Sequence, residues 1–170
     1  MSSKHTASAG SAEFRRACGA FATGIAIATV TGRDGKPHGL TVNSFTSVSL
    51  HPPLVLICVA HKAATHGPFA SAASFAINIL HQGQADLSTR FASSHPNRFD
   101  GVDWSAGANG APLLTDSLAV LECETRERIE AGDHTIFLGE VRRTACAPQL
   151  EEAEAGAPLI YYRGTYAKLG

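Results

Sequence analysis

The chain has 170 residues, of which 44% are hydrophobic and 17% are charged, and its formal net charge is −1. This length is typical of one domain with a substantial core, and the charge balance excludes a basic surface that would recruit nucleic acid or anionic lipid. Because charged residues are scarcer than in an average soluble domain, we expect a partner subunit or a bound ligand to cover part of the surface.

The polar N-terminus and the spacing of the cysteines predict where in the cell the protein is located. Residues 1–12 lack the apolar segment of a secretory signal, so they are interpreted as a flexible arm in front of one domain at 13–170. No segment predicts a membrane span. The cysteines form no CxxC pair and are expected to be reduced, buried thiols: Cys18, Cys58, Cys123 and Cys146. The expected location is the cytoplasm.

The first third of the chain predicts one helix and three strands. Phe14, Cys18 and Phe21 recur at the spacing of one helical face. Alternating or continuous apolar runs then predict strands over 24–30, 39–50 and 54–60. Asp34-Gly35 is a hairpin signal that joins the first two strands. The uninterrupted run at 54–60 predicts a strand that is buried on both faces.

The rest of the chain predicts two short helices and four further strands. The helices are expected at 65–75 and 84–92, and the strands at 75–80, 118–129, 134–146 and within 158–169. Residues 93–112 are predicted to be a loop because they are rich in Gly, Pro, Asn and Asp. About seven strands with short connections favour a mainly β antiparallel barrel or sandwich. Neither GxGxxG nor GxxxxGK[ST] occurs as a nucleotide-binding loop, which excludes a Rossmann or Walker site.

The predicted strand at 39–50 carries an unusual polar face. Its even positions at both ends are apolar, whereas its odd positions are uncharged and mostly polar: Thr41, Asn43, Phe45, Ser47 and Ser49. Buried polar groups need partners, since an unpaired one costs about 1–3 kcal/mol. Two interpretations remain open. Another element covers this face and satisfies the hydroxyls locally, or the face is a platform for an uncharged heteroaromatic ring.

A second candidate site precedes the predicted helix at 65–75. Lys62 and Thr65 lie where free N–H groups of a helix start would favour a phosphate. The alternative is an ordinary capped helix beside a solvated lysine. Arg90 is a candidate for a further phosphate or adenine contact, although a single arginine on a helix is usually solvated.

The GDH triplet at 132–134 is the third candidate. Neighbouring strand residues point to opposite faces, so Asp133 is not expected to orient His134. His134 is therefore interpreted as a donor or a wall of a site, with an ordinary surface histidine as the alternative. The histidines are dispersed and HExxH is absent, so no metal site is expected. The GxSxG motif of serine hydrolases is also absent.

Together, several segments resemble the flavin reductase family, whose members are small flavin:NAD(P)H oxidoreductases serving two-component monooxygenases. The segments are FRRACGAFATGIAIAT, HGLTVNSFTSVSLHPPLVLICV, FAINIL, RFASSHPNRFDGVDW, LECE, GDHTIFLGEV and PLIYYRGTY. The resemblance implies the flavin-binding split barrel, an antiparallel Greek-key fold. It also implies hydride transfer from NADH or NADPH to FMN or FAD, an oxygenase that receives reduced flavin, and a homodimer.

The resemblance also implies roles for individual residues. The flavin ring and ribityl chain would contact Thr41, Val42, Asn43, Ser44, Ser47, Cys58 and Val59. Lys62 and Thr65 would hold the phosphate, and Arg90 and Phe91 would flank the rest of the nucleotide. His134 would lie beside the nicotinamide, and Tyr166 would lie near the site.

Two alternative functions remain open at this point. A split barrel can bind flavin as a carrier without oxidising NAD(P)H. It can also be a one-component enzyme that keeps its flavin and reduces an organic substrate. The GDH motif argues against the carrier.

Overall fold

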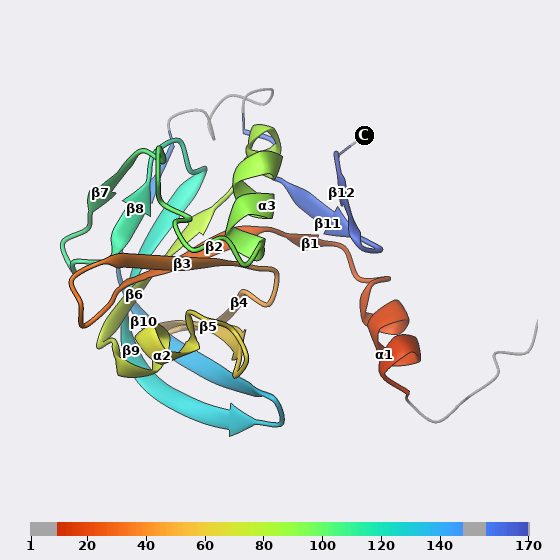
Figure 1. Ribbon diagram of the computed structural model, residues 1–170, viewed down its shortest axis with the longest axis horizontal. Helices are drawn as coiled ribbons and strands as arrows, with labels where there is room; N and C mark the ends of the chain where they lie inside the picture. Colours follow the sequence, from red (N-terminus) through yellow and green to blue (C-terminus); the bar gives the residue numbers. More distant parts are fainter. Residues whose placement is uncertain (1–9, 148–155, 170) are drawn as a thin grey trace, which may run out of the picture.

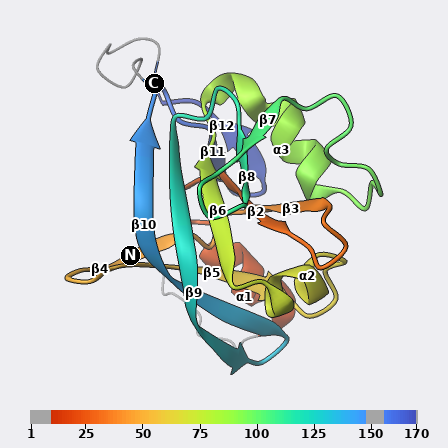
Figure 2. The same ribbon diagram turned by 90° about the vertical axis from the view of Figure 1, so that its left-hand side faces the viewer.

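A seven-stranded antiparallel sheet forms the body of the computed structural model, which describes residues 10–147 and 156–169 (Figure 1). Its strands are β2 Ala26–Thr31, β3 Pro37–Val42, β4 Thr46–Leu50, β5 Pro53–Ala60, β6 Ser74–Ile79, β9 Ala119–Ala131 and β10 His134–Cys146. Their order in the sheet is β3-β2-β6-β9-β10-β5-β4. Figure 2 shows β9 and β10 as a long hairpin that crosses the whole body.

Smaller elements surround this sheet. The helices are α1 Ser11–Cys18, α2 His66–Ser71 and α3 Ala85–Ala92, with a 3₁₀ turn at Gln82–Gln84. A second sheet contains β1 Thr23–Gly24, β11 Ile160–Tyr162 and β12 Thr165–Ala167, and β7 Trp104–Ala106 pairs with β8 Pro112–Leu114. Residues 1–9 of the predicted arm lie outside the described residues, so the domain division at residue 12 stays a prediction.

The two edges of the large sheet are consecutive in the chain. β3 pairs only with β2 and β4 only with β5, yet residues 43–45 alone separate β3 from β4. Such a short connection between opposite edges is possible only if the sheet curls until its edges approach each other. The two edge strands, which are fully described, do not pair with each other. The result is an open antiparallel barrel, which confirms the split barrel that the resemblance implied.

The single strand predicted over 39–50 is therefore wrong, because the chain bends at Asn43 and begins a new strand at Thr46. The alternation of apolar residues continues across the bend and hides it in the sequence. A β-bulge between Ser47 and Ser49 changes the register of β4 further. As a result Val48 and Leu50, which were expected to face the core, are 47% and 81% exposed.

The core has two parts. One fills the barrel and includes Phe69, Phe75 and Phe137, and the other lies under α3 around Phe91. β5 was expected to be buried on both faces, but only Val55, Ile57 and Val59 are buried, while the alternate residues of this strand are half-buried. The expectation was wrong because no element within residues 10–147 and 156–169 buries the second face of β5.

Some predictions of individual turns, helices and strands are confirmed by the structure, and others are wrong. The hairpin turn at Asp34-Gly35 is confirmed, with Gly35 at φ +72°. The helix predicted at 84–92 is α3, and strands predicted at 75–80 and 134–146 are β6 and β10. The loop predicted at 93–112 also contains β7 and part of β8. All four cysteines are free, but Cys18 and Cys146 are exposed and not buried.

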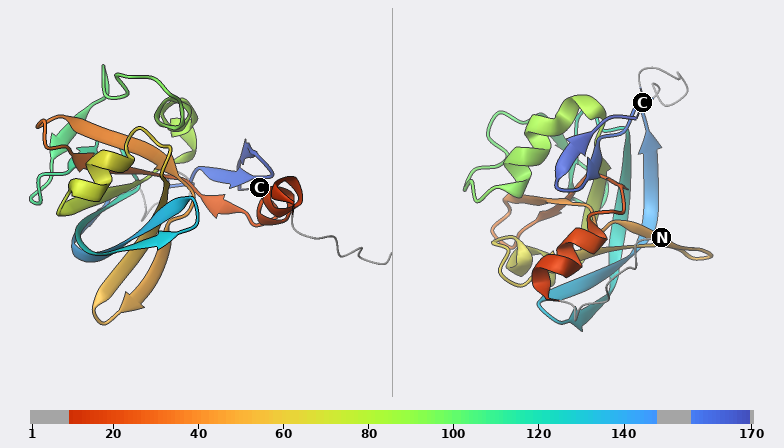
Figure 3. Two further views of the ribbon diagram at one scale, coloured as in Figure 1. Left: turned by 60° about the horizontal axis from the view of Figure 1, so that its bottom comes forward. Right: turned by 90° about the vertical axis from the view of Figure 1, so that its right-hand side faces the viewer.

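Helix α1 lies apart from the barrel, next to the β11–β12 hairpin (Figure 3). The amide of Arg163 in that hairpin donates to the carbonyl of Gly19 at 3.0 Å and ties the end of α1 to it. None of the α1 side chains is buried, and Phe14 and the following Phe21 are 62% and 76% exposed. Within residues 10–147 and 156–169, no helix combines the length and apolar character that crossing a bilayer requires.

Candidate functional site

A cavity of about 880 Å³ lies between the open barrel, α1 and the β11–β12 hairpin. This volume is within the range of small-molecule sites. The barrel contributes Asn43 and Ser44 of the β3–β4 corner, Cys58 of β5, and His134 and Ile136 of β10. Four predicted site residues therefore meet at one cavity: Asn43, Ser44, Cys58 and His134.

The β3–β4 corner is fixed to the neighbouring strand by Ser44. The Ser44 hydroxyl accepts a hydrogen bond from the Cys58 amide at 3.0 Å and donates to the Cys58 carbonyl at 3.3 Å. The Thr41 hydroxyl donates to the Ser88 carbonyl at 2.6 Å. The Thr41 hydroxyl is thus satisfied by the protein, as the first interpretation of the odd-numbered face expected, and the Ser44 hydroxyl of the corner is satisfied as well. The Asn43 amide remains at the cavity, where it can contact a ligand.

The contact between His134 and Asp133 corrects a sequence-based expectation. Their Nδ1 and Oδ1 atoms are 2.7 Å apart, so the ring donates to the carboxylate. The alternation rule does not apply, because Asp133 lies in the tight β9–β10 turn, where Gly132 has φ +65°. With Nδ1 donating, the neutral imidazole has Nε2 as its acceptor. The hydrogen bond from His134 lowers the pKa of Asp133, which keeps this carboxyl ionised at neutral pH.

Cys58 contributes an unreactive thiol. Burial raises its pKa, and the hydrogen bond with Ser44 counteracts this only in part. A thiol with a raised pKa remains protonated near neutral pH and is a poor nucleophile. Cys58 therefore serves as a wall of the cavity and not as a reactive group.

The remaining predicted residues lie elsewhere. Val42 and Val59 are core residues, so only their backbone can reach a ligand. Ser47 lies on the exposed edge strand β4, and Lys62 is exposed near Asp133. The structure does not bring these four side chains into the cavity.

The three predicted residues on α3 and β12 have structural partners. Arg90 donates through Nη2 to the carbonyls of Asn97 and Asp100, which holds the loop after α3. Phe91 is fully buried in the core under α3. The Tyr166 hydroxyl donates to Ser88 Oγ at 2.8 Å. In this arrangement Phe91 has no exposed surface for the predicted contact with a nucleotide, and Arg90 already binds protein carbonyls.

Thr65 lies at a second cavity, of about 410 Å³, at the other end of β3. It occupies the predicted position before α2, but its side chain does not cap that helix. The residue is 5% exposed, and its Oγ1 atom has no hydrogen-bond partner among the described residues. An unpaired hydroxyl at this depth indicates a missing ligand or water.

The sequence did not identify the outer wall of the first cavity. α1 and the β11–β12 hairpin supply this wall through Phe14, Arg15, Cys18, Gly19, Phe21, Tyr161, Arg163 and Gly164, and Thr23 of β1 and Ala131 complete the lining. The helical spacing of the phenylalanines predicted α1 but not its partner surface. The YYRGTY segment contributed to the resemblance to the flavin reductase family. Its position beside His134 could not be predicted, because it depends on the long-range pairing of β1 with β11.

Comparison with known proteins identifies the family. A family model described as "Flavin reductase like domain" matches residues 18–170, so the chain belongs to the flavin reductase-like family. It is similar to a "Probable flavin reductase" of Rhizobium meliloti (strain 1021), with 48% identity over 127 residues and 75% of this chain. It is also similar to the "Stachydrine N-demethylase reductase subunit Stc3" of the same organism, with 46% identity over 127 residues and 75% of this chain.

A solved structure agrees over the whole chain. The "NADH:FAD oxidoreductase SgcE6" of Streptomyces globisporus C-1027 has a TM-score of 0.88 and 38% identity, and the match covers 100% of this chain and 99% of that one. The alignments with the two Rhizobium proteins cover only 41% and 55% of their lengths. This chain therefore spans about half of those relatives.

Proposed function

We propose that this protein is a flavin reductase that transfers a hydride from NADH or NADPH to FMN or FAD. The observation that carries the proposal is the meeting of the Asn43–Ser44 corner, Cys58 and His134 at one cavity. Membership of the flavin reductase-like family and the similarity to an NADH:FAD oxidoreductase support it.

The lining of the cavity fits a flavin. Phe14, Phe21, Ile136 and Tyr161 provide apolar and aromatic surface for a tricyclic ring, and the Asn43 amide provides a donor and an acceptor for its edge. Thr23 Oγ1 at this cavity is buried and has no partner among the described residues. A ring with carbonyl and ring-nitrogen groups would satisfy both polar side chains.

The chemistry would be the transfer of a hydride from C4 of the nicotinamide to N5 of the flavin, and the protein would supply binding and orientation. No general base is needed, which agrees with the neutral Cys58 thiol. Asp133 would hold the imidazole of His134 in one orientation beside the nicotinamide. Arg15 and Arg163 line the same cavity and would favour the negative charge of the reduced ring.

Reduced flavin would then pass to an oxygenase. The similarity to a demethylase reductase subunit supports this role. Flavin must therefore be held with moderate affinity, as a substrate that leaves. A cytoplasmic location, as expected from the sequence, remains part of the proposal.

Anaerobic mixing of the protein with NADH and excess FMN or FAD tests the function. We expect the absorbance band of oxidised flavin to bleach over many turnovers. The absence of bleaching with both NADH and NADPH would contradict the proposal, and a yellow, inactive protein would select the carrier. Flavin that stays bound through gel filtration, with NAD(P)H consumed only when an organic substrate is added, would select the one-component enzyme.

We also propose a homodimer whose interface closes the cavity from outside. An isolated helix of eight residues is unstable in water, and α1 buries no side chain in its own protomer. Phe14 and Phe21 are largely exposed beside the cavity, and the second face of β5 is only half-buried. A second copy that packs on α1 would cover these residues and shield the flavin from water.

A further inference from the structure

The face of β10 opposite the first cavity carries a cluster of polar side chains that the proposed hydride transfer does not use. Thr135 follows His134 in β10, so the two side chains point to opposite faces of the strand. His134 lines the first cavity, whereas Thr135 is only 2% exposed. The hydroxyl of Thr135 contacts His66 of α2 and Glu130 of β9, and Glu130 also contacts His61, which follows β5.

The two partners of the Thr135 hydroxyl fix the direction of both hydrogen bonds. The hydroxyl donates to Glu130 Oε1 at 3.0 Å, and its oxygen lies 2.8 Å from His66 Nε2. A hydroxyl has only one proton to donate. Because that proton points to Glu130, His66 Nε2 donates the second bond. Glu130 Oε2 accepts from His61 Nε2 at 2.9 Å, so the network joins α2, both strands of the β9–β10 hairpin and the segment after β5.

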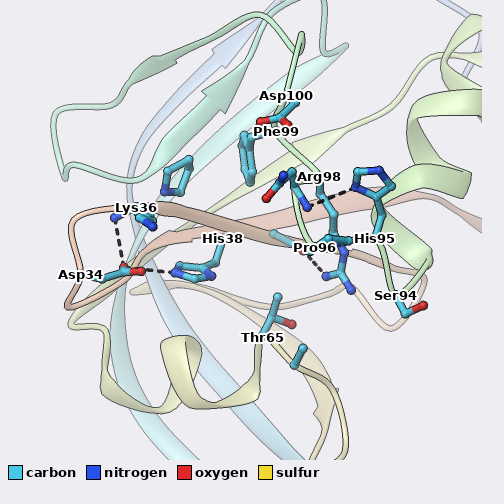
Figure 4. A pocket seen from close by; sticks show the side chains of 14 residues that line it. Asp34, Lys36, His38, Thr65, Ser94, His95, Pro96, Arg98, Phe99 and Asp100 are labelled. Atoms are coloured by element: carbon cyan, nitrogen blue, oxygen red, sulfur yellow. Dashed lines mark hydrogen bonds and ion pairs between the residues drawn. The ribbon is translucent and has the colours of Figure 1, made fainter.

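The ring of His66 is held by its neighbours. It meets the His61 ring edge to face, with the ring centroids 5.1 Å apart, and the buried Phe137 ring at 6.2 Å. The preceding residue, Thr65, faces the second cavity (Figure 4), whereas His66 does not line it. In the part of the chain that the structure describes, no three His, Cys, Asp or Glu side chains are placed to hold a metal ion. The cluster is therefore a hydrogen-bonded anchor for Thr135.

The turn before His134 holds the imidazole only weakly. The side chains of His134 and Asp133 are 43% and 90% exposed, and water competes with a polar contact between groups this exposed. His134 is also the last paired residue of β10 in both of its ladders, opposite Ala60 and Ala131. The ends of strands open more easily than their centres. The place of the imidazole therefore depends on what holds the first residues of β10.

We propose that Thr135 and His66 are positioning residues for His134. They hold the start of β10 from the barrel side, so that the imidazole on the opposite face keeps its place beside the nicotinamide. This inference rests on the proposed function for the role of His134. Hydride transfer requires the reacting atoms about 3–3.5 Å apart and aligned, so a small shift of this wall slows the reaction. The contacts of the flavin at the β3–β4 corner would not change.

Thr135→Val is the first test, because it nearly keeps the shape of the side chain but leaves His66 Nε2 and Glu130 Oε1 without this partner. We expect the turnover number with NADH to fall about fivefold and the KM for NADH to rise a few-fold. The dissociation constant for flavin, measured by fluorescence titration, should stay as in the wild type. Thr135→Ser keeps the hydroxyl and should restore most of the turnover.

Thr29→Val is the matched control for a loss of stability. Thr29 is as deeply buried in β2, and its hydroxyl also has two partners, because it accepts from Asn78 Nδ2 at 3.2 Å and donates to the Pro112 carbonyl. The control should lower the melting temperature about as much as Thr135→Val does, but leave turnover and KM for NADH unchanged. An equal kinetic loss in Thr29→Val would overturn the proposal.

A double-mutant cycle tests whether Thr135 acts through His134. In a His134→Ala enzyme, Thr135→Val should cause no further loss of turnover, since there is no imidazole left to position. The same fold-loss in both backgrounds would contradict the proposal.

His66→Phe keeps a ring for the contacts with His61 and Phe137 but has no Nε2 donor, so it carries the test if Thr135→Val does not fold. We expect about a two- to threefold loss of turnover with NADH and unchanged flavin affinity. Wild-type turnover in His66→Phe, or a loss of flavin affinity as large as the loss of turnover, would overturn the proposal. Bleaching of flavin by the wild type with NADH separates these outcomes from a failure of the proposed function.

Discussion

His134→Ala is expected to lower the turnover number for flavin reduction by roughly 10- to 100-fold while flavin still binds. The imidazole lines the first cavity and is held by Asp133 at 2.7 Å, so its loss removes one wall beside the expected nicotinamide position. A misplaced nicotinamide reaches the hydride-transfer geometry less often. Stopped-flow absorbance under anaerobic conditions measures the step directly, and a titration measures flavin binding separately.

Asp133→Asn is the comparison for this variant. It keeps an oxygen that can accept from Nδ1 but removes the charge, so we expect a several-fold loss in turnover number and a smaller change in flavin affinity. Because the pKa of Asp133 lies below its usual value, the wild-type carboxylate stays ionised across the neutral range, and the pair should persist from about pH 5 to pH 8. A His134→Ala enzyme with wild-type turnover and nicotinamide affinity would remove this residue from the site.

A double charge substitution on the α1 region, Phe14→Glu with Phe21→Glu, is expected to convert the protein to monomers. Burial of a phenylalanine contributes about 1.5–3 kcal/mol, and a symmetric dimer would bury four of them. The lower total for four side chains is about 6 kcal/mol. A loss of only half of this free energy, about 3 kcal/mol, would weaken dimerisation more than 100-fold. Sedimentation velocity over a range of protein concentrations measures the change.

The control for this experiment is Arg16→Glu on the same helix. Arg16 is exposed and does not line the first cavity, so its variant should sediment like the wild type. A wild-type protein that sediments as a monomer at all concentrations would contradict the proposed dimer. A double variant that remains dimeric would place the interface elsewhere than on α1.

The β3–β4 corner shows why the sequence patterns predicted a barrel but wrongly predicted a single strand over 39–50. Hairpin signals and alternating runs are local, and they predicted β2, β6 and β10 well. The bend at Asn43 left no signal of its own, because polar residues occupy odd positions on both sides of it, as at Thr41 and Ser47. Only the pairing of β3 with β2 and of β4 with β5 reveals that these neighbours lie at opposite edges. Long-range pairing of this kind cannot be read from local periodicity.

The two cavities also differ in how far their residues could be predicted from the sequence. Asn43, Ser44, Cys58 and His134 were predicted to act together through the resemblance of their motifs, and the fold brings them to one cavity. Arg98, which lines the second cavity, was not predicted, since it lies in a loop without periodicity and only the fold brings it next to Gly39. Phe91 was assigned to the nucleotide by the resemblance, but it is a core residue.

A crystal structure of the protein with bound FAD tests the central claim most directly. We predict the flavin ring in the 880 Å³ cavity, against the Asn43–Ser44 corner and Cys58, with His134 beside its reacting face. A ring bound at any other surface, with this cavity left to solvent, would contradict the account.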